Sequence, residues 1–201
     1  MSAALDIGNV GAGFARPVHG SQAVFRAALE ALSRPGTAVV AGEAAQWPRG
    51  IGQAAGAVLL ALLDHETRLW IAPSDNAHAI ASYLRFHTGC ALAASPAQAD
   101  FAFVDHPERL PDLAAFAAGT DHYPDRSTTI VVEVAAIEGR GWTLAGPGIE
   151  QHAHMAAAVP GGRFVAQWRE QRRRFPRGVD LLLACEDSLA ALPRTTSIEE
   201  G

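Results

Sequence analysis

Short apolar runs alternate with longer amphipathic segments along this chain, and this alternation is the strongest constraint on its fold. Strands are predicted at residues 37–41, 68–72, 101–104, 128–137, 142–145, 179–184 and 189–192. Helices are predicted from Ser21 to the Pro35-Gly36 stop and at residues 52–63, 76–89, 108–118 and 162–174. This order predicts an α/β fold, a mixed β-sheet flanked by helices, in which strands joined through a helix are parallel.

Turn residues divide the pattern further. Gly139-Arg140-Gly141 separates residues 128–137 from residues 142–145 and predicts an antiparallel hairpin there. Residues 1–18 are rich in Gly and end near Arg16-Pro17, so we expect an extended N-terminal arm. The chain length of 201 residues then predicts a single α/β domain over residues 19–201.

The charge composition excludes some functions. All 16 basic residues are Arg and the chain has no Lys, so it cannot form a Schiff base with pyridoxal phosphate or a carbonyl substrate. The net charge of −5 gives no field that attracts nucleic acid. Charged residues make up only 18% of the chain, which favours a subunit of an oligomer or complex over a free monomer.

Cysteine usage and hydropathy indicate a reduced, cytoplasmic protein. Cys90 and Cys185 lie far apart, adjoin apolar runs and are too few for a four-cysteine zinc or iron–sulfur site. The N-terminus lacks the pattern of a signal peptide. The longest apolar run, residues 54–63, is too short to span a membrane, so we expect no membrane partner.

Two polar clusters are candidates for binding. His152 and His154 would share one face of a strand and could bind a metal with Glu150, but a solvated pair is the more common outcome without a signposted third ligand. Five arginines lie on and after the predicted helix 162–174: Arg169, Arg172, Arg173, Arg174 and Arg177. They form either a solvated face or a surface for an anion or a partner. We predict no metal site and no cofactor.

A third group is distinctive without matching a catalytic motif. Its members lie at helix ends, in loops and at strand ends: Arg85, His87, Gly146, Gly148, Pro176, Gly178, Asp180, Pro193, Arg194, Thr195 and Thr196. Asp180 adjoins an apolar run and, if buried, needs backbone amides or an Arg as its partner. Gly146-Pro147-Gly148 permits close approach of backbone. We predict structural or interface roles here, and no catalytic residue.

Five segments, taken in order, resemble a known family. They are Ser21–Arg26 through Ser33–Gly36, Leu84–Thr88, Gly146–Ile149, Phe175–Leu181 and Pro193–Thr196. Together they resemble the PhnH family, the H subunits of the bacterial carbon–phosphorus lyase system, over residues 19–196. The run Arg172–Arg174 is not a feature of this resemblance.

The resemblance implies a fold similar to that of pyridoxal-phosphate-dependent transferases, with the cofactor lost. It also implies a homodimer that joins G, I and J subunits in a core complex that processes phosphonates. In that complex a phosphonate displaces adenine from ATP, which gives α-D-ribose 1-methylphosphonate 5-triphosphate when the phosphonate is methylphosphonate. The H subunit has no assigned catalytic residue, so we expect it to act by assembly and by shaping the site.

A second hypothesis remains open from the residues alone. The chain could be a small-molecule enzyme or binding protein that holds a phosphonate or nucleotide through Arg85, His87 and Arg194, because guanidinium and imidazolium groups bind such anions.

Overall fold

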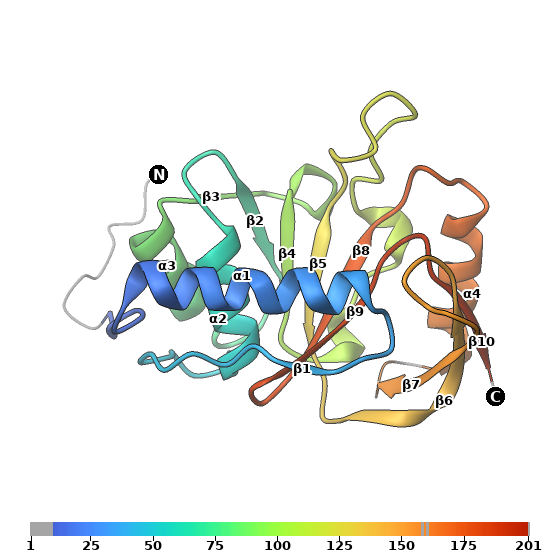
Figure 1. Ribbon diagram of the computed structural model, residues 1–201. Coiled ribbons are helices and arrows are strands. Elements are labelled where there is room, and N and C mark those ends of the chain that lie inside the picture. Colours follow the sequence, from blue (N-terminus) through green and yellow to red (C-terminus); the bar gives the residue numbers. More distant parts are fainter. Residues whose placement is uncertain (1–9, 158, 160, 201) are drawn as a thin grey trace.

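The computed structural model describes residues 10–157, 159 and 161–200, and it is an α/β structure with two sheets (Figure 1). Its helices are α1 (Pro17–Ser33), α2 (Gln53–Leu62), α3 (Ala77–Thr88), η2 (Pro96–Gln98), η3 (Pro107–Arg109), η4 (Leu113–Ala115) and α4 (Gly161–Arg172), where η marks a short 3₁₀ helix. Its strands are β1 (Val39–Val40), β2 (Arg68–Ile71), β3 (Ala91–Leu92), β4 (Phe101–Val104), β5 (Thr129–Glu133), β6 (Ile137–Ala145), β7 (Ala153–Ala157), β8 (Asp180–Cys185), β9 (Ser188–Leu192) and β10 (Ser197–Glu200).

The large sheet is mixed, as predicted. Within the described residues its strand order is β1-β9-β8-β5-β4-β2-β3. Adjacent strands are parallel along the run β8-β5-β4-β2-β3, while β9 is antiparallel to both β8 and β1. The carboxyl ends of the four central strands therefore meet at one edge, which is where ligands bind in many α/β sheets.

Alternate residues of the large sheet enter two different cores. In β8, for example, Leu182 packs with α1, α2 and α3, whereas Leu181 and Leu183 pack with α4 and the small sheet. Helix α2 is apolar nearly all round and its residues Ala54–Leu59 are buried, as expected for a helix covered on most sides. No helix among the described residues is both long and apolar enough to cross a membrane.

The small sheet has the order β10-β6-β7 and is antiparallel throughout. It covers the second face of the large sheet together with α4, at the end of the molecule where the C-terminus lies (Figure 1). Trp142 of β6 stacks on Phe164 of α4 with ring centroids 5.5 Å apart, and Trp168 is completely buried behind them.

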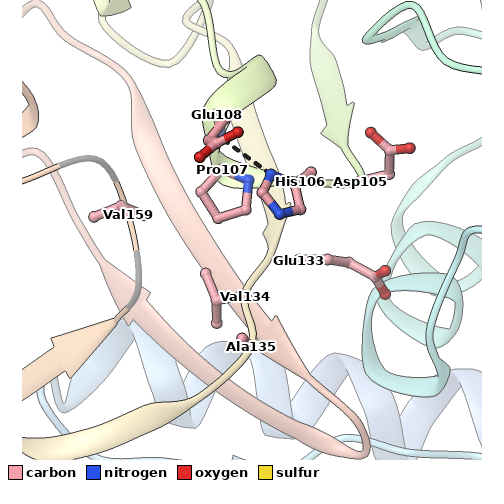
Figure 2. A pocket seen from close by; sticks show the side chains of 8 residues that line it. All are labelled: Asp105, His106, Pro107, Glu108, Glu133, Val134, Ala135 and Val159. Atoms are coloured by element: carbon pink, nitrogen blue, oxygen red, sulfur yellow. Dashed lines mark hydrogen bonds between the residues drawn. The ribbon is translucent and has the colours of Figure 1, made fainter.

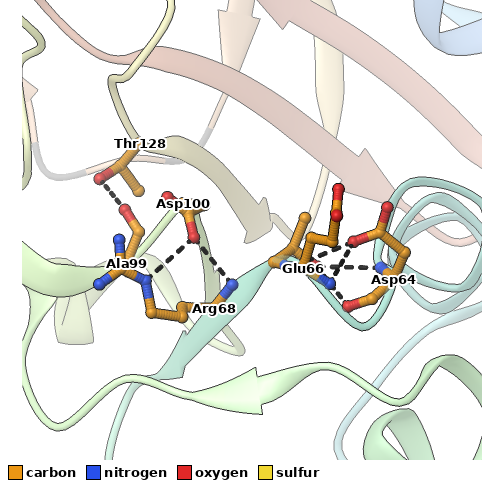
Figure 3. Close-up of polar contacts among 7 residues, drawn as sticks. Asp64, Glu66, Arg68, Ala99, Asp100 and Thr128 are labelled. Atoms are coloured by element: carbon orange, nitrogen blue, oxygen red, sulfur yellow. Dashed lines mark hydrogen bonds and ion pairs between the residues drawn. The ribbon is translucent and has the colours of Figure 1, made fainter.

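Side chains fasten the amino edge of the large sheet (Figure 3). Asp100, just before β4, accepts hydrogen bonds from the backbone N–H of Arg68 at 2.9 Å and from its guanidinium at 3.3 Å. Thr128, just before β5, donates to the carbonyl of Ala99 at 2.7 Å. These contacts fix the relative positions of β2, β4 and β5, and hence of the residues at the opposite, carboxyl edge.

The predicted helix at residues 108–118 is wrong. The chain forms two 3₁₀ turns there, η3 and η4, separated by Leu110 in an extended conformation. Pro111 explains the break, because proline lacks the N–H that a continuing helix needs and disfavours the helical conformation in the residue before it.

The predicted hairpin between residues 128–137 and 142–145 is also wrong. β5 stays in the large sheet, and the second run is part of the longer β6, which pairs with β7 and β10. Gly141 lies at a register shift within the β6–β7 pair, so the glycines mark a bulge and not a turn. β3, β7 and β10 were not predicted from the sequence; β3 has only two residues and β10 is mostly polar.

Helix α1 begins at Pro17, four residues before the predicted start at Ser21. Proline suits the first turn because its missing N–H has no helical partner there. The helix thus includes the last two residues of the predicted arm, 1–18. Residues 1–9 of that arm lie outside the described residues.

Candidate functional site

A cavity of about 580 Å³ opens at the carboxyl ends of β4 and β5. It is lined by residues that directly follow β4, by the end of β5 and by one residue before α4: Asp105, His106, Pro107, Glu108, Glu133, Val134, Ala135 and Val159. Figure 2 shows Val159 on one side of this space and Asp105 and Glu133 on the other, with Pro107, Glu108 and His106 in between. We call this the edge cavity.

Glu133 is the last residue of β5, and its carboxylate accepts a hydrogen bond from the backbone N–H of Gly52, immediately before α2. Burial raises the pKa of Glu133 to about 7, the Gly52 N–H opposes this rise, and the charge of Asp105 adds to it. Near neutral pH this carboxyl group therefore exists in both its protonated and its ionised form. Such a group can donate as well as accept a proton.

Asp105 follows β4, and its side chain is largely buried. Its side chain is only 9% exposed, and its Oδ2 atom accepts a hydrogen bond from Arg109 Nη1 at 2.6 Å. Its Oδ1 atom is buried and has no hydrogen-bond partner among the described residues. A buried carboxylate oxygen without a donor is rare in folded proteins.

The other lining residues shape the cavity. His106 Nδ1 accepts a hydrogen bond of 3.3 Å from the backbone N–H of Glu108, which orients the imidazole at the start of η3. Pro107 and Val159 are buried, so one part of the wall is apolar. The edge cavity thus combines carboxyl groups with an apolar part of its wall.

A second site gathers most of the distinctive loop residues, at the amino end of β8. Asp180 and Arg194 form an ion pair whose side chains are 20% and 15% exposed. Asp180 Oδ1 also accepts from the backbone N–H of Arg194 at 2.7 Å, and the same guanidinium donates to Ser127 and to the carbonyl of Pro124. Asp180 therefore has both partners that the sequence allowed, an amide and an Arg.

Gln171 of α4 holds the backbone of Val179, the residue before Asp180. Its side chain accepts from the N–H of Val179 at 3.0 Å and donates to the carbonyl of Val179 at 3.3 Å. Gly178 has a φ of +149°, and a Cβ there would lie 3.2 Å from Gln171 Oε1. A side chain at position 178 would therefore be strained.

The closing segment Pro193–Thr196 is held by α4 and by the Gly146 loop. Trp168 Nε1 donates to the carbonyl of Thr196 at 2.8 Å, and Arg172 donates to the carbonyl of Thr195. A Cβ on Gly146 would lie 2.8 Å from that same Thr195 oxygen. We call the group Gly146, Gly178, Asp180 and Pro193–Thr196 the motif cluster, and its contacts are internal to the fold.

Arg85 and His87 lie on α3, which packs with α1 and α2 on one face of the large sheet. His87 Nε2 is 2.9 Å from the carbonyl of Gly11, and Tyr83 donates to the carbonyl of Ala12 at 3.1 Å. These contacts hold the segment before α1 against α3. Arg85 and His87 are thus on the helix α3, whereas Arg194 belongs to the motif cluster at the amino end of β8.

Comparison with known proteins decides the family. The profile of the family described as "Bacterial phosphonate metabolism protein (PhnH)" matches residues 12–199. The chain belongs to the PhnH family. It is 40% identical over 188 residues to the alpha-D-ribose 1-methylphosphonate 5-triphosphate synthase subunit PhnH of Rhizobium meliloti (strain 1021), covering 92% of this chain and 94% of that protein. It is 33% identical over 180 residues to the putative C-P lyase subunit protein HtxG of Stutzerimonas stutzeri, covering 88% and 85%.

The residues that carried the resemblance to the PhnH family do not form one site. The motif cluster is at the amino end of β8, and Arg85 and His87 lie on α3. Gly148 packs at the end of α1, where a Cβ would lie 2.0 Å from the carbonyl of Ser33. Pro176 follows a cis peptide bond in the loop before β8.

The structure also shows where the His pair and the five arginines lie. His154 lies in β7 opposite Thr143, with a distance of 3.4 Å between Nδ1 and Oγ1, and His152 is exposed just before that strand. The residues that the structure describes contain no group of three or more His, Cys, Asp or Glu that could hold a metal ion. The five arginines bind groups of the chain itself: Arg169 and Arg172 reach carbonyls near β10, Arg173 and Arg174 reach Glu170, and Arg177 reaches Asp121.

The edge cavity was not predicted from the sequence. The available signal was the position of Asp105 directly after one predicted strand and of Glu133 within another, because polar residues at the carboxyl ends of parallel strands converge. Nothing in the sequence alone said that these two strands are neighbours.

Proposed function

We propose that this PhnH-family chain is a subunit of a carbon–phosphorus lyase complex in phosphonate catabolism. In that role it supports formation of alpha-D-ribose 1-methylphosphonate 5-triphosphate from ATP and methylphosphonate, with displacement of adenine. It contributes by assembly and by shaping the site, and not by a catalytic residue of its own. The related proteins are named as subunits, which is the first support for this role.

The observation that carries the proposal is an exposed apolar stripe on α1. Val18, Phe25 and Leu29 are 80%, 47% and 50% exposed. Their spacing of seven and four residues places them on one face of the helix, beside the buried face that holds Val24 and Ala28. Contiguous apolar side chains on a helix surface are typical of a face that contacts another protein. We call these three residues the α1 stripe.

The alternative, a separate enzyme or binding protein for phosphonates, has less support. It needs Arg194 to bind an anion, but the Arg194 guanidinium already donates to Asp180, Ser127 and Pro124. His87 contacts the carbonyl of Gly11. These side chains are engaged in holding the fold, which favours assembly over direct substrate binding.

The finer features of the proposal concern partners and ancestry. The partners are the G, I and J subunits of the lyase core and a second copy of this chain, in the cytoplasm. The fold is related to that of pyridoxal-phosphate-dependent transferases without their cofactor. The absence of Lys supports this last point, since the covalent link to the cofactor requires a Lys.

Co-expression with tagged G, I and J subunits, followed by native mass spectrometry, tests the role. We expect the wild-type chain to co-purify, and the double variant Phe25→Glu/Leu29→Glu to lose this association while it keeps its circular dichroism spectrum. The matched control is Arg26→Ala/Glu30→Ala, which changes exposed polar residues of the same helix turns. Failure of the wild-type chain to associate refutes the subunit role, whereas association of the Glu variant refutes only the assignment of the α1 stripe.

A further inference from the structure

A second cavity, of about 340 Å³, lies between α4, the turn η4 and the loop before β8. One face of α4, Ala118 with residues at η4, and the segment Arg177–Val179 form its walls. It shares no described lining residue with the edge cavity. We call it the α4 cavity. Because Arg177–Val179 lies within the motif segment Phe175–Leu181, that motif shapes a cavity as well as holding the fold.

Two glutamines of α4, one helical turn apart, fix the walls of the α4 cavity. Gln167 accepts a hydrogen bond from the backbone N–H of Leu113 at 2.7 Å and donates to Asp112 Oδ1 at 2.7 Å. Gln171 binds the backbone N–H and carbonyl of Val179. Both walls are thus tied to the same helix, so the cavity is formed before any ligand arrives, which lowers the cost of binding.

The lining of the α4 cavity combines apolar groups with cations. Its apolar side chains come from both walls, and they are Leu113, Ala114, Ala118 and Val179. Its charged residues are Arg163, Arg174 and Arg177 against Asp112 and Glu170. Positive charge is therefore in excess here, although the whole chain carries a net charge of −5.

The three guanidinium groups keep donors that the described chain does not use. Each makes one side-chain contact through a single nitrogen, and the contacts are Arg163 Nη2 with Asp112, Arg174 Nη2 with Glu170, and Arg177 Nε with Asp121. A guanidinium has three nitrogens and five N–H donors. By contrast, both oxygens of Glu170 are engaged, by Arg173 and Arg174. The donors that remain beside the apolar walls suit an anionic acceptor.

We propose that the α4 cavity binds a small organic anion, an apolar ring or short branched chain that carries a carboxylate or phosphonate group. The apolar body lies against Leu113, Ala118 and Val179, and the oxyanion accepts from the arginines. The volume of about 340 Å³ is at the lower end of the range of small-molecule sites, which favours a ligand with a single ring. The inference goes beyond the assembly role and does not depend on it, because it concerns the isolated chain.

Isothermal titration calorimetry of the full chain with phenylphosphonate and benzoate tests the proposal. We expect saturable binding of at least one of them, and the two probes distinguish a phosphonate from a carboxylate site. Methylphosphonate lacks the ring, benzyl alcohol lacks the charge and benzamidine has the opposite charge. Each of these three is expected to bind at least about tenfold more weakly, because the site requires both the apolar body and the anion.

Variants locate the bound anion. Arg174→Gln and Arg177→Gln are each expected to weaken binding about fivefold or more, because each removes a guanidinium from the cavity. Arg173→Gln is the matched control. Arg173 also pairs with Glu170, but it is not among the described residues that line the α4 cavity, so its loss is expected to change binding by less than about twofold. Ala114→Phe fills the cavity from an exposed position, leaves every arginine in place and is expected to abolish binding.

Three results overturn the proposal. The first is the absence of heat for both phenylphosphonate and benzoate at millimolar concentration. The second is binding of methylphosphonate, benzyl alcohol or benzamidine as tight as that of the ring-bearing anions. The third is wild-type binding in Ala114→Phe, or an equal loss in Arg173→Gln and Arg174→Gln. Circular dichroism and thermal melting show that each variant is folded, and the exposed Arg174→Gln keeps the test decisive if Ala114→Phe is unstable.

Discussion

The protonation of Glu133 makes a quantitative prediction about stability and pH. The ordinary glutamate pKa is 4.5, and that of folded Glu133 is about 7. Between these two pH values the folded chain binds more protons at this group than the unfolded chain does, so its contribution to the free energy of unfolding falls as pH rises. Above about pH 7 the group is ionised in both states and the loss is complete.

The size of this effect follows from the two pKa values. Their difference corresponds to about 3 kcal/mol for a group shielded from solvent. Because Glu133 is only partly buried, screening by solvent reduces the expected effect to about 1–2 kcal/mol. The variant Glu133→Gln is neutral at every pH and keeps an oxygen that can accept the hydrogen bond from the N–H of Gly52.

Urea unfolding followed by circular dichroism, at intervals from about pH 5 to about pH 8, measures the effect. We expect the stability difference between Glu133→Gln and the wild type to grow in favour of the variant by about 1–2 kcal/mol over this range. Comparing the two proteins cancels the titration of groups that they share. Glu108→Gln, with an exposed carboxyl group lost from the same cavity, is the control. Parallel curves for wild type and Glu133→Gln would refute the reasoning.

Three further variants test the contacts around the motif cluster and α1. Arg194→Ala leaves the largely buried Asp180 without its cation and is expected to lower the free energy of unfolding by about 3 kcal/mol. Arg68→Ala breaks an exposed ion pair and is expected to lower it by less than about 1 kcal/mol. Equal losses of stability in urea unfolding would contradict this. Gly148→Ala is expected to lower stability by about 2 kcal/mol or more, because φ is +82° and a Cβ meets the carbonyl at the end of α1, whereas Gly139→Ala meets nothing within 4 Å and should be nearly neutral in thermal melting. Trp168→Phe loses one buried hydrogen bond and leaves a cavity where the larger ring packed, and it is expected to cost about 2 kcal/mol or more; an unchanged unfolding midpoint would contradict this.

Local patterns predicted the elements where the pattern was strong. The apolar run after Gly178 became β8, the central parallel strands were placed correctly, and α2 and α3 have nearly the predicted bounds. The two wrong predictions, the helix at residues 108–118 and the hairpin, have local causes in the sequence. Pro111 interrupts the segment predicted as a helix, and the glycines taken for a hairpin turn form a bulge inside β6.

The candidate site required information of another kind. Asp105 and Glu133 are 28 positions apart; in the sequence Asp105 directly follows one predicted strand and Glu133 lies within another. They meet because β4 and β5 are parallel neighbours with a fixed register. Conversely, Arg194 looked like a candidate for anion binding, and only its contacts show that its donors are used by Asp180, Ser127 and Pro124.

The sequence by itself determined the chemistry that is excluded and the family. A chain without Lys cannot form the covalent link to pyridoxal phosphate whatever its fold, and ordered motifs carry family membership because they do not depend on knowing which residues touch. Only the tertiary structure shows which polar side chains bind other groups of the chain and which have no partner among the described residues. Burial, pairing and pKa depend on neighbours in space, so only the assembled sheet shows that Asp180 is satisfied while Asp105 keeps an oxygen free of any described donor.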